Sequence, residues 1–383
     1  MYICNTNIIV DENISYAPEA FSQFGNVSVI HGREINNNLL KNADALIVRS
    51  ITKVDENLLK GTPVKFVGTA TIGTDHIDLK YLDSKGIFFS GAKGCNADAV
   101  TEYVFTAVIK LLNGNSSALK GKSIGIVGTG NIGSRIARIA GAIGMKVLKN
   151  DPPLQRKSGA ADFVPLNEIY NCDIITLHVP LNKDGIDKTV HLFDRENLNI
   201  LNDNVILINA SRGPVVDNTA LAEAVDKKSI RAVLDVWENE PDINTAMLER
   251  VKLASPHIAG YSLEGKVNGT VIIYKALCKF LGEQPVWKPS LPVIETPVKN
   301  LNHTGNSVEE LNSIISKIYD IKKDDAKMRG ISAMPKAQIP KYFDTLRKEY
   351  PLRREFNNFK IKLTTPDKEL VNILTALRFE CIF

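Results

Sequence analysis

The sequence predicts an α/β protein with two doubly wound parallel sheets, followed by a small α+β segment at the C-terminus. Short apolar runs alternate with helical stretches within residues 1–97 and again within residues 98–257. Strands that alternate with helices form parallel sheets, because each parallel pair needs a crossover connection. Beyond Gln284 the character changes to a proline-rich connector and then to charged helices with short apolar runs, which indicates a third, smaller region.

The first alternating region contains five candidate strands, which are Ile8–Val10, Val27–Ile30, Ala45–Val48, Lys65–Val67 and Ile87–Phe89. A long helix begins at Asp98, where Val100, Val104, Val108 and Leu111 give one apolar stripe at helical spacing. We expect this helix to bridge two domains.

The second region contains six candidate strands, several of them continuous apolar runs that are typical of a sheet covered on both faces. They are Ile124–Val127, Lys146–Leu148, Asp173–Leu177, Val205–Asn209, Ala232–Val236 and Leu253–Ala254. A helix over Tyr261–Leu281 is placed to return the chain to the first region. The predicted domains are therefore 1–97 with 258–284, then 98–257, then 285–383.

Bulk composition argues against several classes of protein. The net charge is +4 with no dense basic block, so nucleic-acid binding has no compositional support. No apolar run approaches the roughly 20 residues that span a bilayer, and the N-terminus lacks the pattern of a signal peptide. The five cysteines are scattered with no Cys-x-x-Cys pair, which favours reduced thiols in a cytoplasm over disulfides or zinc.

A glycine loop, Gly128-Thr-Gly130-Asn131-Ile132-Gly133, directly follows the strand Ile124–Val127 and opens a helix. This pattern suits a dinucleotide: Gly128 allows a tight turn, Gly130 lets a pyrophosphate approach the backbone, and Gly133 lets helix and strand pack closely. Asp151 follows the next strand, where its carboxylate would bind ribose hydroxyls and repel a 2′-phosphate. We therefore expect NAD, although a plain glycine-rich turn would give the same pattern.

Residues that could act in catalysis follow three strands of the second region. Arg212 can hold a carboxylate bidentately, and Glu240 can raise the pKa of His257 and fix its tautomer. The alternatives are a surface arginine and solvated acidic loop residues, and we expect Glu238 to be solvated. Together these residues favour an enzyme.

Other chemistries find less support. The remaining histidines lack comparable neighbours, so a structural role is the default for each, although His178 ends a strand at the same sheet edge. No His/Cys/Asp cluster has ligand spacing, so we expect no metal. The chain also has no Gly-x-Ser-x-Gly elbow of a serine hydrolase.

The glycine loop, Asp151-Pro, Asn209-Ala-Ser-Arg212-Gly, Glu240-Pro and Pro256-His257 together resemble the D-isomer-specific 2-hydroxyacid dehydrogenases. The resemblance implies a flavodoxin-like substrate domain, a Rossmann NAD domain and catalysis by Arg212, Glu240 and His257. It further implies substrate contacts by Ser50, Thr71 and Tyr261, and NAD contacts by Asp151, Ala210, Ser211, Arg212, Asp235 and Gly260. Val179 occupies a position near the cofactor where threonine is also common in the family.

Several more specific sequence segments resemble one branch of this family. They include Phe66–His76, Pro256–Lys266 and the C-terminal segments Tyr319–Asp325 and Leu352–Phe356. The resemblance implies oxidation of 4-phospho-D-erythronate at C2 in pyridoxal 5′-phosphate biosynthesis, by a homodimer that pairs through residues 285–383. Arg49 and Lys53 are candidate ligands of the 4-phosphate, and Arg353 or Arg354 could reach it from the partner subunit.

Two other functions stay open at this point. A phosphoglycerate dehydrogenase or hydroxypyruvate reductase would use the same catalytic trio. An NAD-responsive binding scaffold could keep the trio without turnover.

Overall fold

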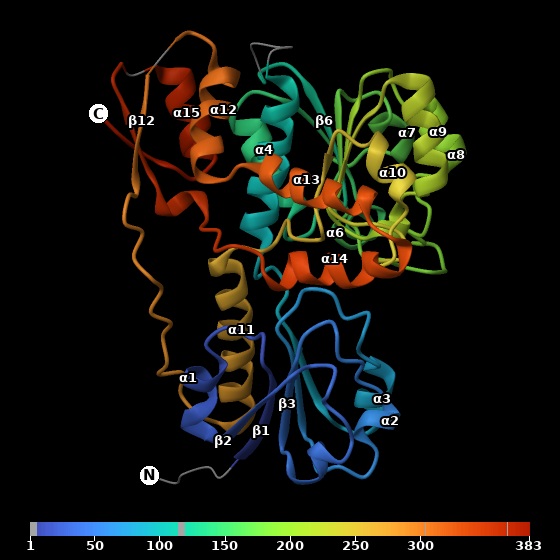
Figure 1. Ribbon diagram of the computed structural model, residues 1–383, viewed down its shortest axis with the longest axis vertical. Helices are drawn as coiled ribbons and strands as arrows, with labels where there is room; N and C mark the ends of the chain where they lie inside the picture. Colours follow the sequence, from blue (N-terminus) through green and yellow to red (C-terminus); the bar gives the residue numbers. More distant parts are fainter. Residues whose placement is uncertain (1–5, 114–118, 303, 366) are drawn as a thin grey trace. The chain divides into compact units, whose positions relative to one another are not determined.

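In the computed structural model, which describes residues 6–113, 119–302, 304–365 and 367–383, the chain divides into two units (Figure 1). The first unit combines Met1–Asn96 with Ser262–Val293, and the second combines Ala97–Tyr261 with Ile294–Phe383. The C-terminal segment, residues 294–383, thus packs with the second region of the chain and forms no separate unit. The assignment of substrate and cofactor binding to these regions stays a prediction.

The first unit is built on a parallel sheet with the strand order β2-β1-β3-β4-β5. This is the flavodoxin-like order, as expected. Its strands are β1 (Thr6–Asp11), β2 (Gly25–Ile30), β3 (Ala45–Val48), β4 (Phe66–Thr69) and β5 (Phe88–Gly91). Helices α1 (Ala17–Phe21) and α11 (Leu263–Leu281) share one core with the sheet, while α2 (Glu56–Leu59) and α3 (Leu79–Ser84) contribute to a second core.

The second unit contains a parallel sheet with the order β11-β10-β9-β8-β6-β7. The strands are β6 (Ser123–Val127), β7 (Lys146–Asn150), β8 (Ile174–Leu177), β9 (Ile206–Asn209), β10 (Arg231–Leu234) and β11 (Leu253–Ala254). The strand order reverses between β6 and β8, and ligands of such sheets bind at the carboxyl ends beside this switch point.

Helices cover both faces of this second sheet, which explains its continuous apolar strands. One core joins the sheet to α4 (Ala97–Leu112) and α5 (Gly133–Ala142). The other joins it to α7 (Leu166–Ile169), α8 (Arg195–Ile200), α9 (Asn218–Lys228) and α10 (Thr245–Arg250). A further short helix, α6 (Pro152–Ser158), follows β7.

Side-chain caps fix where many of these helices begin. The Asp217 carboxylate accepts a hydrogen bond from the Ala220 amide at the start of α9, and the Ser262 hydroxyl accepts one from Gly265 at the start of α11. Asp151 caps α6 in the same way through the Leu154 amide. Such caps satisfy amides that have no partner within the helix.

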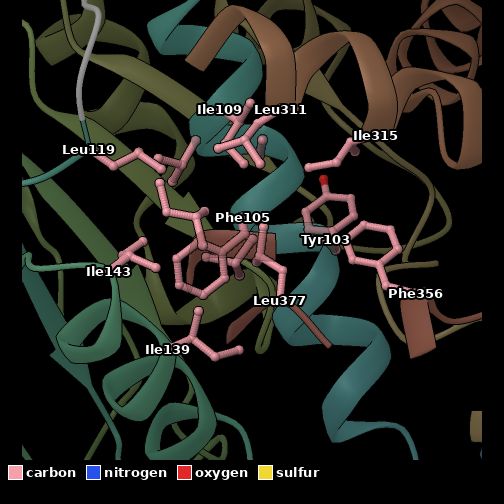
Figure 2. Close-up of a cluster of buried hydrophobic side chains, with 14 of the residues drawn as sticks. Tyr103, Phe105, Ile109, Leu119, Ile139, Ile143, Leu311, Ile315, Phe356 and Leu377 are labelled. Carbon is pink, nitrogen blue, oxygen red and sulfur yellow. The ribbon is translucent and has the colours of Figure 1, made fainter. Parts of the chain in front are cut away.

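Helix α4 differs from its expected role as a bridge with one apolar stripe. Thirteen of its sixteen residues are buried, because the C-terminal segment covers the side of the helix that faces away from the sheet. Figure 2 shows Tyr103, Phe105 and Ile109 of α4 among side chains of both regions, including Ile139, Leu311, Ile315, Phe356 and Leu377. A helix enclosed on all sides belongs to a core, so α4 has more than the single apolar stripe that the sequence predicts.

The C-terminal segment adds a parallel sheet of order β12-β13-β14. It consists of β12 (Val298–Leu301), α12 (Ser307–Ile318), α13 (Ile321–Arg329), α14 (Ile339–Lys348), β13 (Lys360–Leu363), α15 (Lys368–Ala376) and β14 (Glu380–Ile382). Helices α12 and α15 share the core of α4, whereas Met328 of α13 and Phe343 of α14 pack into the core beside α10. No helix in the described ranges has the length and apolar character needed to cross a membrane.

Candidate active site

Three neighbouring strands of the second sheet, β9, β10 and β11, deliver the side chains expected to carry chemistry. Arg212 follows β9, Glu240 follows β10 and His257 follows β11. Because the strands are parallel, their carboxyl ends lie at the same edge of the sheet. The sheet order thus brings together three loops that are well separated in the sequence.

His257 and Glu240 form a hydrogen-bonded pair. The His257 Nδ1 lies 2.8 Å from the Glu240 Oε2, and the other carboxylate oxygen, Oε1, accepts a hydrogen bond from the Trp237 amide at 2.7 Å. Since the carboxylate takes Nδ1–H, the distal Nε2 is the nitrogen left to exchange a proton. Among the described residues, Nε2 has no hydrogen-bond partner.

Electrostatics keep the Glu240 carboxylate charged. Burial by itself would raise the pKa of Glu240, but His257, the Trp237 amide and the positive charge of Arg347 outweigh burial and lower the pKa. A carboxylate held in this state stabilises an imidazolium on His257 when that ring takes up a proton.

Asp235 fixes the turn that carries His257. Its buried carboxylate accepts hydrogen bonds from the Ser255 hydroxyl at 2.5 Å, the Ile258 amide at 2.8 Å and the Ala259 amide at 3.0 Å. His257 itself has a φ of 58°, a left-handed conformation that a non-glycine residue adopts only when its surroundings enforce it. The resemblance assigns Asp235 to the nicotinamide. In this structure, the hydrogen bonds described for the Asp235 carboxylate all go to groups of the protein itself.

The Arg212 loop is held by local hydrogen bonds. The Asn209 Oδ1 accepts from the Ser211 amide and hydroxyl, and its Nδ2 donates to the Arg212 carbonyl at 3.0 Å. A Cβ added at Gly213 would lie 1.9 Å from the Trp237 carbonyl oxygen. Only glycine lets the loop after β9 approach the loop after β10 this closely.

The glycine loop has the shape of a phosphate cradle. Gly128 has a φ of 86° and a Cβ there would strike the His178 carbonyl, while a Cβ at Gly133 would lie 2.1 Å from the Gly128 oxygen. A Cβ at Gly130, in contrast, meets nothing within 4 Å. The space beside Gly130 and the adjoining turn, Asn131 and Ile132 before α5, therefore fit a pyrophosphate at a helix N-terminus.

Asp151 and Val179 lie next to this cradle. The Asp151 Oδ2 accepts from the Thr129 amide at 2.7 Å, and Oδ1 accepts from the Leu154 amide at 3.0 Å. The second lone pair of Oδ1 can take a ribose hydroxyl. The Val179 side chain lies 2.9 Å from where a Cβ on Gly128 would be, so it borders the loop. Ala210, Ser211 and Gly260 belong to the loops after β9 and β11.

The candidate substrate residues divide between the two units. Ser50, Thr71 and Arg49 belong to the first unit, at the ends of β3 and β4, and Tyr261 belongs to the second. The Thr71 hydroxyl lies 2.8 Å from the Thr69 hydroxyl, which lies 3.0 Å from the His76 Nε2. His76 thus supports Thr71 through Thr69, a connection that the sequence pattern did not indicate.

Three expectations about other charged residues change. Glu238 is not simply solvated, because its Oε1 lies 2.7 Å from the His191 Nε2 and its Oε2 accepts from the Asn218 amide at 2.9 Å. Arg353 is 6% exposed and donates to the Ala99 and Ala259 carbonyl oxygens of its own chain. Its guanidinium is therefore a structural group, and the expectation that it reaches a partner's substrate is wrong. Lys53 is exposed and pairs with Asp55 at 2.8 Å.

Sequence reasoning missed Arg347, a residue of α14. Its Nη2 donates to the Tyr261 hydroxyl at 3.2 Å, and its charge acts on Glu240. The separation of more than eighty residues between α14 and these loops leaves no local sequence signal for this contact.

Two sequence families divide the second unit between them. Residues 106–259 match the D-isomer specific 2-hydroxyacid dehydrogenase NAD-binding domain, a range that contains the glycine loop, Asp151, Arg212, Glu240 and His257. Residues 291–377 match a domain family of unknown function, DUF3410. The loops of the site and the C-terminal segment thus carry different family signatures.

Curated relatives match this chain over nearly its full length. An erythronate-4-phosphate dehydrogenase from Photorhabdus laumondii is 45% identical over 375 residues, which are 97% of this chain and 98% of that protein. One from Pseudomonas fluorescens is 43% identical over 374 residues, with 97% and 98% covered.

Solved structures match a smaller part. A D-lactate dehydrogenase from Aquifex aeolicus, complexed with NAD and lactic acid, aligns with a TM-score of 0.61 and 28% identity, covering 72% of this chain and 96% of that chain. The NAD-bound 3-phosphoglycerate dehydrogenase of Entamoeba histolytica aligns with a TM-score of 0.63 and 25% identity, covering 73% and 96%. More than a quarter of this chain has no counterpart in these two structures.

Proposed function

This chain belongs to the erythronate-4-phosphate dehydrogenases, NAD-dependent enzymes of the D-isomer specific 2-hydroxyacid dehydrogenase family, and we propose that Arg212, Glu240 and His257 carry out its reaction. The reaction is the oxidation of 4-phospho-D-erythronate to (R)-3-hydroxy-2-oxo-4-phosphonooxybutanoate, a step of pyridoxal 5′-phosphate biosynthesis. The observation that carries the assignment of residues is the 2.8 Å contact between His257 and Glu240 at the strand edge that also holds Arg212.

The cofactor is NAD, and the residues present fit it. The open space at Gly130, the start of α5 and the Asp151 carboxylate would hold the pyrophosphate and ribose. When bound, NAD supplies the acceptor for the hydride that leaves C2. We propose that Val179, Ala210, Ser211, Asp235 and Gly260 line the same site.

His257 acts as the base in this proposal. Its Nε2 takes the proton of the C2 hydroxyl while the C2 hydrogen leaves as hydride, so the C2–O bond becomes a carbonyl. The ring becomes an imidazolium, and Glu240 stabilises it through the Nδ1–H hydrogen bond. General-base catalysis of this kind typically contributes about 10²–10⁴ in rate.

Arg212 orients the substrate. A guanidinium binds a carboxylate through two parallel N–H···O bonds, which fixes the plane of the C1 carboxylate and hence the direction of C2. The backbone of the loop is held by Asn209 and cannot move toward β10 because Gly213 already contacts Trp237. Positioning of this kind reduces the entropic part of the barrier.

We also propose roles for the two units and for the C-terminal segment. The first unit would bind substrate through Ser50, Thr71 and Arg49, with Tyr261 contributing from the second. A homodimer paired through the C-terminal segment is supported by the exposed apolar side chains Leu352 and Phe383, at 66% and 70% exposure. Light scattering of the purified protein tests this, and a monomer at micromolar concentration would contradict it. A cytoplasmic location agrees with the scattered cysteines.

The decisive experiment follows the absorbance of reduced nicotinamide when the purified protein meets NAD and 4-phospho-D-erythronate, with 3-phosphoglycerate in parallel. A 2-oxo acid is added so that cofactor that does not leave the protein can be reoxidised. Turnover confined to 4-phospho-D-erythronate is expected. Preference for 3-phosphoglycerate would favour a phosphoglycerate dehydrogenase, and inactivity with both would favour an NAD-responsive binding protein.

A further inference from the structure

The C-terminal segment places a cation on Tyr261, four residues after His257, where its charge acts on Glu240. Arg347, in the last turn of α14, donates from Nη2 to the Tyr261 hydroxyl at 3.2 Å, and its guanidinium carbon lies 5.9 Å from the centre of the Tyr261 ring. The Tyr261 ring also packs edge-on against Tyr350, at 5.9 Å between centroids. Tyr261 thus contacts the guanidinium through both its hydroxyl and its ring.

This arginine comes from a part of the chain outside the NAD-binding family signature. The match to the dehydrogenase family ends at residue 259, and α14 lies within the separate match over residues 291–377. The trio needs only residues of the first match. Arg347 therefore adds a charge to the strand edge that the trio does not itself require.

The guanidinium has donor capacity that the protein does not use. Arg347 Nε is buried and, among the described residues, has no hydrogen-bond partner. Burial by itself would lower the pKa of Arg347, but Tyr261 and Glu240 more than offset burial and raise it, so the group stays a cation. An unsatisfied buried donor on a cation costs free energy, so the described protein groups leave this guanidinium incompletely paired.

Two carboxylates act on this cation, Glu240 and Asp344. Both Glu240 oxygens already accept hydrogen bonds, from the Trp237 amide and from His257. Arg353, the other arginine of interest in this segment, also has unpartnered nitrogens, Nε and Nη1, among the described residues. It is 6% exposed, and its guanidinium lies over the Tyr319 ring, so it is less open to a ligand than Arg347.

We propose that Arg347 binds the 4-phosphate of the substrate and so determines specificity for a phosphorylated acid. This inference rests on the proposed function, in which Arg212 takes the C1 carboxylate and leaves the phosphate as the second anionic group. Only C3, C4 and a bridging oxygen separate C2 from phosphorus, so a cation beside the base of the reaction is within reach of the phosphate. Guanidinium groups suit phosphate because their fork of N–H donors matches its oxygens.

The test compares phosphorylated and unphosphorylated substrates in the full-length protein. Arg347→Met keeps the aliphatic length that packs on Tyr261 but removes the charge, and Arg347→Lys keeps the charge without the fork. For Arg347→Met, KM for 4-phospho-D-erythronate should rise about 10- to 100-fold, the range expected for one charge-assisted hydrogen bond. The loss of kcat/KM should be at least tenfold smaller for D-erythronate than for 4-phospho-D-erythronate, and Arg347→Lys should recover part of the loss.

The adjacent exposed residue supplies a matched control. Lys348→Met removes a positive charge one position along α14 and should leave both substrates unaffected. Circular dichroism and NAD binding by fluorescence verify that each variant is folded. Inorganic phosphate should compete with substrate in the wild-type protein and compete at least tenfold more weakly in Arg347→Met.

Equal losses of kcat/KM for the two substrates would overturn the proposal. A shifted pH profile of kcat without a selective rise in KM would likewise overturn it, because Arg347 would then act through Glu240. Failure of the wild-type protein to oxidise 4-phospho-D-erythronate would count against the proposed function instead. In that case calorimetric titration with inorganic phosphate still tests Arg347, and equal affinity in wild type and Arg347→Met would contradict it.

Discussion

Two histidine–carboxylate pairs lie in the second unit, and by most measures they look alike. His257 lies 2.8 Å from Glu240 and His191 lies 2.7 Å from Glu238. Both histidines have left-handed backbones, with φ of 58° and 50°. Their side-chain exposures are also close, at 35% for His257 and 42% for His191.

The pairs differ in which ring nitrogen the carboxylate takes. Glu240 binds Nδ1 of His257 and leaves the distal Nε2 for a substrate, whereas Glu238 binds the distal Nε2 of His191. Glu238 also accepts from the Asn218 amide at the start of α9, which is the position of a structural cap. Contact distance therefore does not identify a reactive pair, whereas the orientation of the ring does.

The largest expected effect is a difference in kcat between substitutions of the two histidines. His257→Asn removes the proposed base, so kcat should fall by about 10²–10⁴. His191→Asn should leave kcat within about a factor of two, as for most surface substitutions. Both variants are assayed by reduction of NAD with 4-phospho-D-erythronate. A comparable loss in His191→Asn would show that the second pair is also used.

Substitutions of the two carboxylates should also differ in their effect on kcat, but by a smaller factor than substitutions of the two histidines. Glu240→Gln keeps the shape of the side chain but removes the charge that stabilises the imidazolium, so kcat should fall by roughly 10- to 100-fold. Glu238→Gln should have little effect on kcat. The comparison fails if the two variants lose activity equally.

Glu240 should also affect acid stability. Its pKa in the folded protein is lowered from 4.5, so the unfolded chain binds more protons in this range. The stabilisation is complete above pH 4.5 and is lost as the pH falls through the folded pKa. Glu240→Gln should therefore flatten the acid side of a plot of unfolding free energy against pH, as measured by urea unfolding.

The fourth prediction concerns what holds the His257 turn. Asp235→Asn replaces one accepting oxygen by a donor, so one of the Ser255, Ile258 and Ala259 donors loses its partner. The free energy of unfolding should drop by about 1–3 kcal/mol, and kcat should fall with it. Asp217→Asn near the second pair is the matched control, because asparagine caps helices as well as aspartate. An unchanged melting temperature for Asp235→Asn would contradict this role.

A different comparison involves a third histidine, His178, which makes no contact with a carboxylate among the described residues. Burial lowers the pKa of His178 to about 3, so the unfolded chain takes up this proton first as the pH falls below 6.5. The group therefore removes roughly 3 kcal/mol of stability between pH 7 and pH 4. His178→Asn should lose less stability than the wild type over this interval in urea unfolding, and an identical pH dependence would contradict the shift.

The strands of both large sheets were predictable because periodicity and turn residues are local properties. Each predicted strand lies within about two residues of an observed one, from β1 to β11. The meeting of the Arg212, Glu240 and His257 loops was also predictable, since carboxyl ends of neighbouring parallel strands share one edge. The hydrogen bond between His257 and Glu240 that the sequence suggested is present.

Other features had no local signal. The sequence of α4 reads as one apolar stripe, but its burial depends on α12, α15 and the loop around Phe356 folding over it. Likewise, the sequence places Glu238 and Glu240 in one acidic loop and cannot tell which nitrogen of which histidine each will meet.

The sequence by itself determined the fold class, the cradle for a dinucleotide and the strand ends that carry the trio, because these follow from local patterns and the geometry of parallel sheets. Tertiary structure alone decided that α14 brings Arg347 to Tyr261 and that Asp235 holds the turn of His257. Such contacts join residues far apart in the chain, so they depend on how whole elements pack and not on any spacing within the sequence.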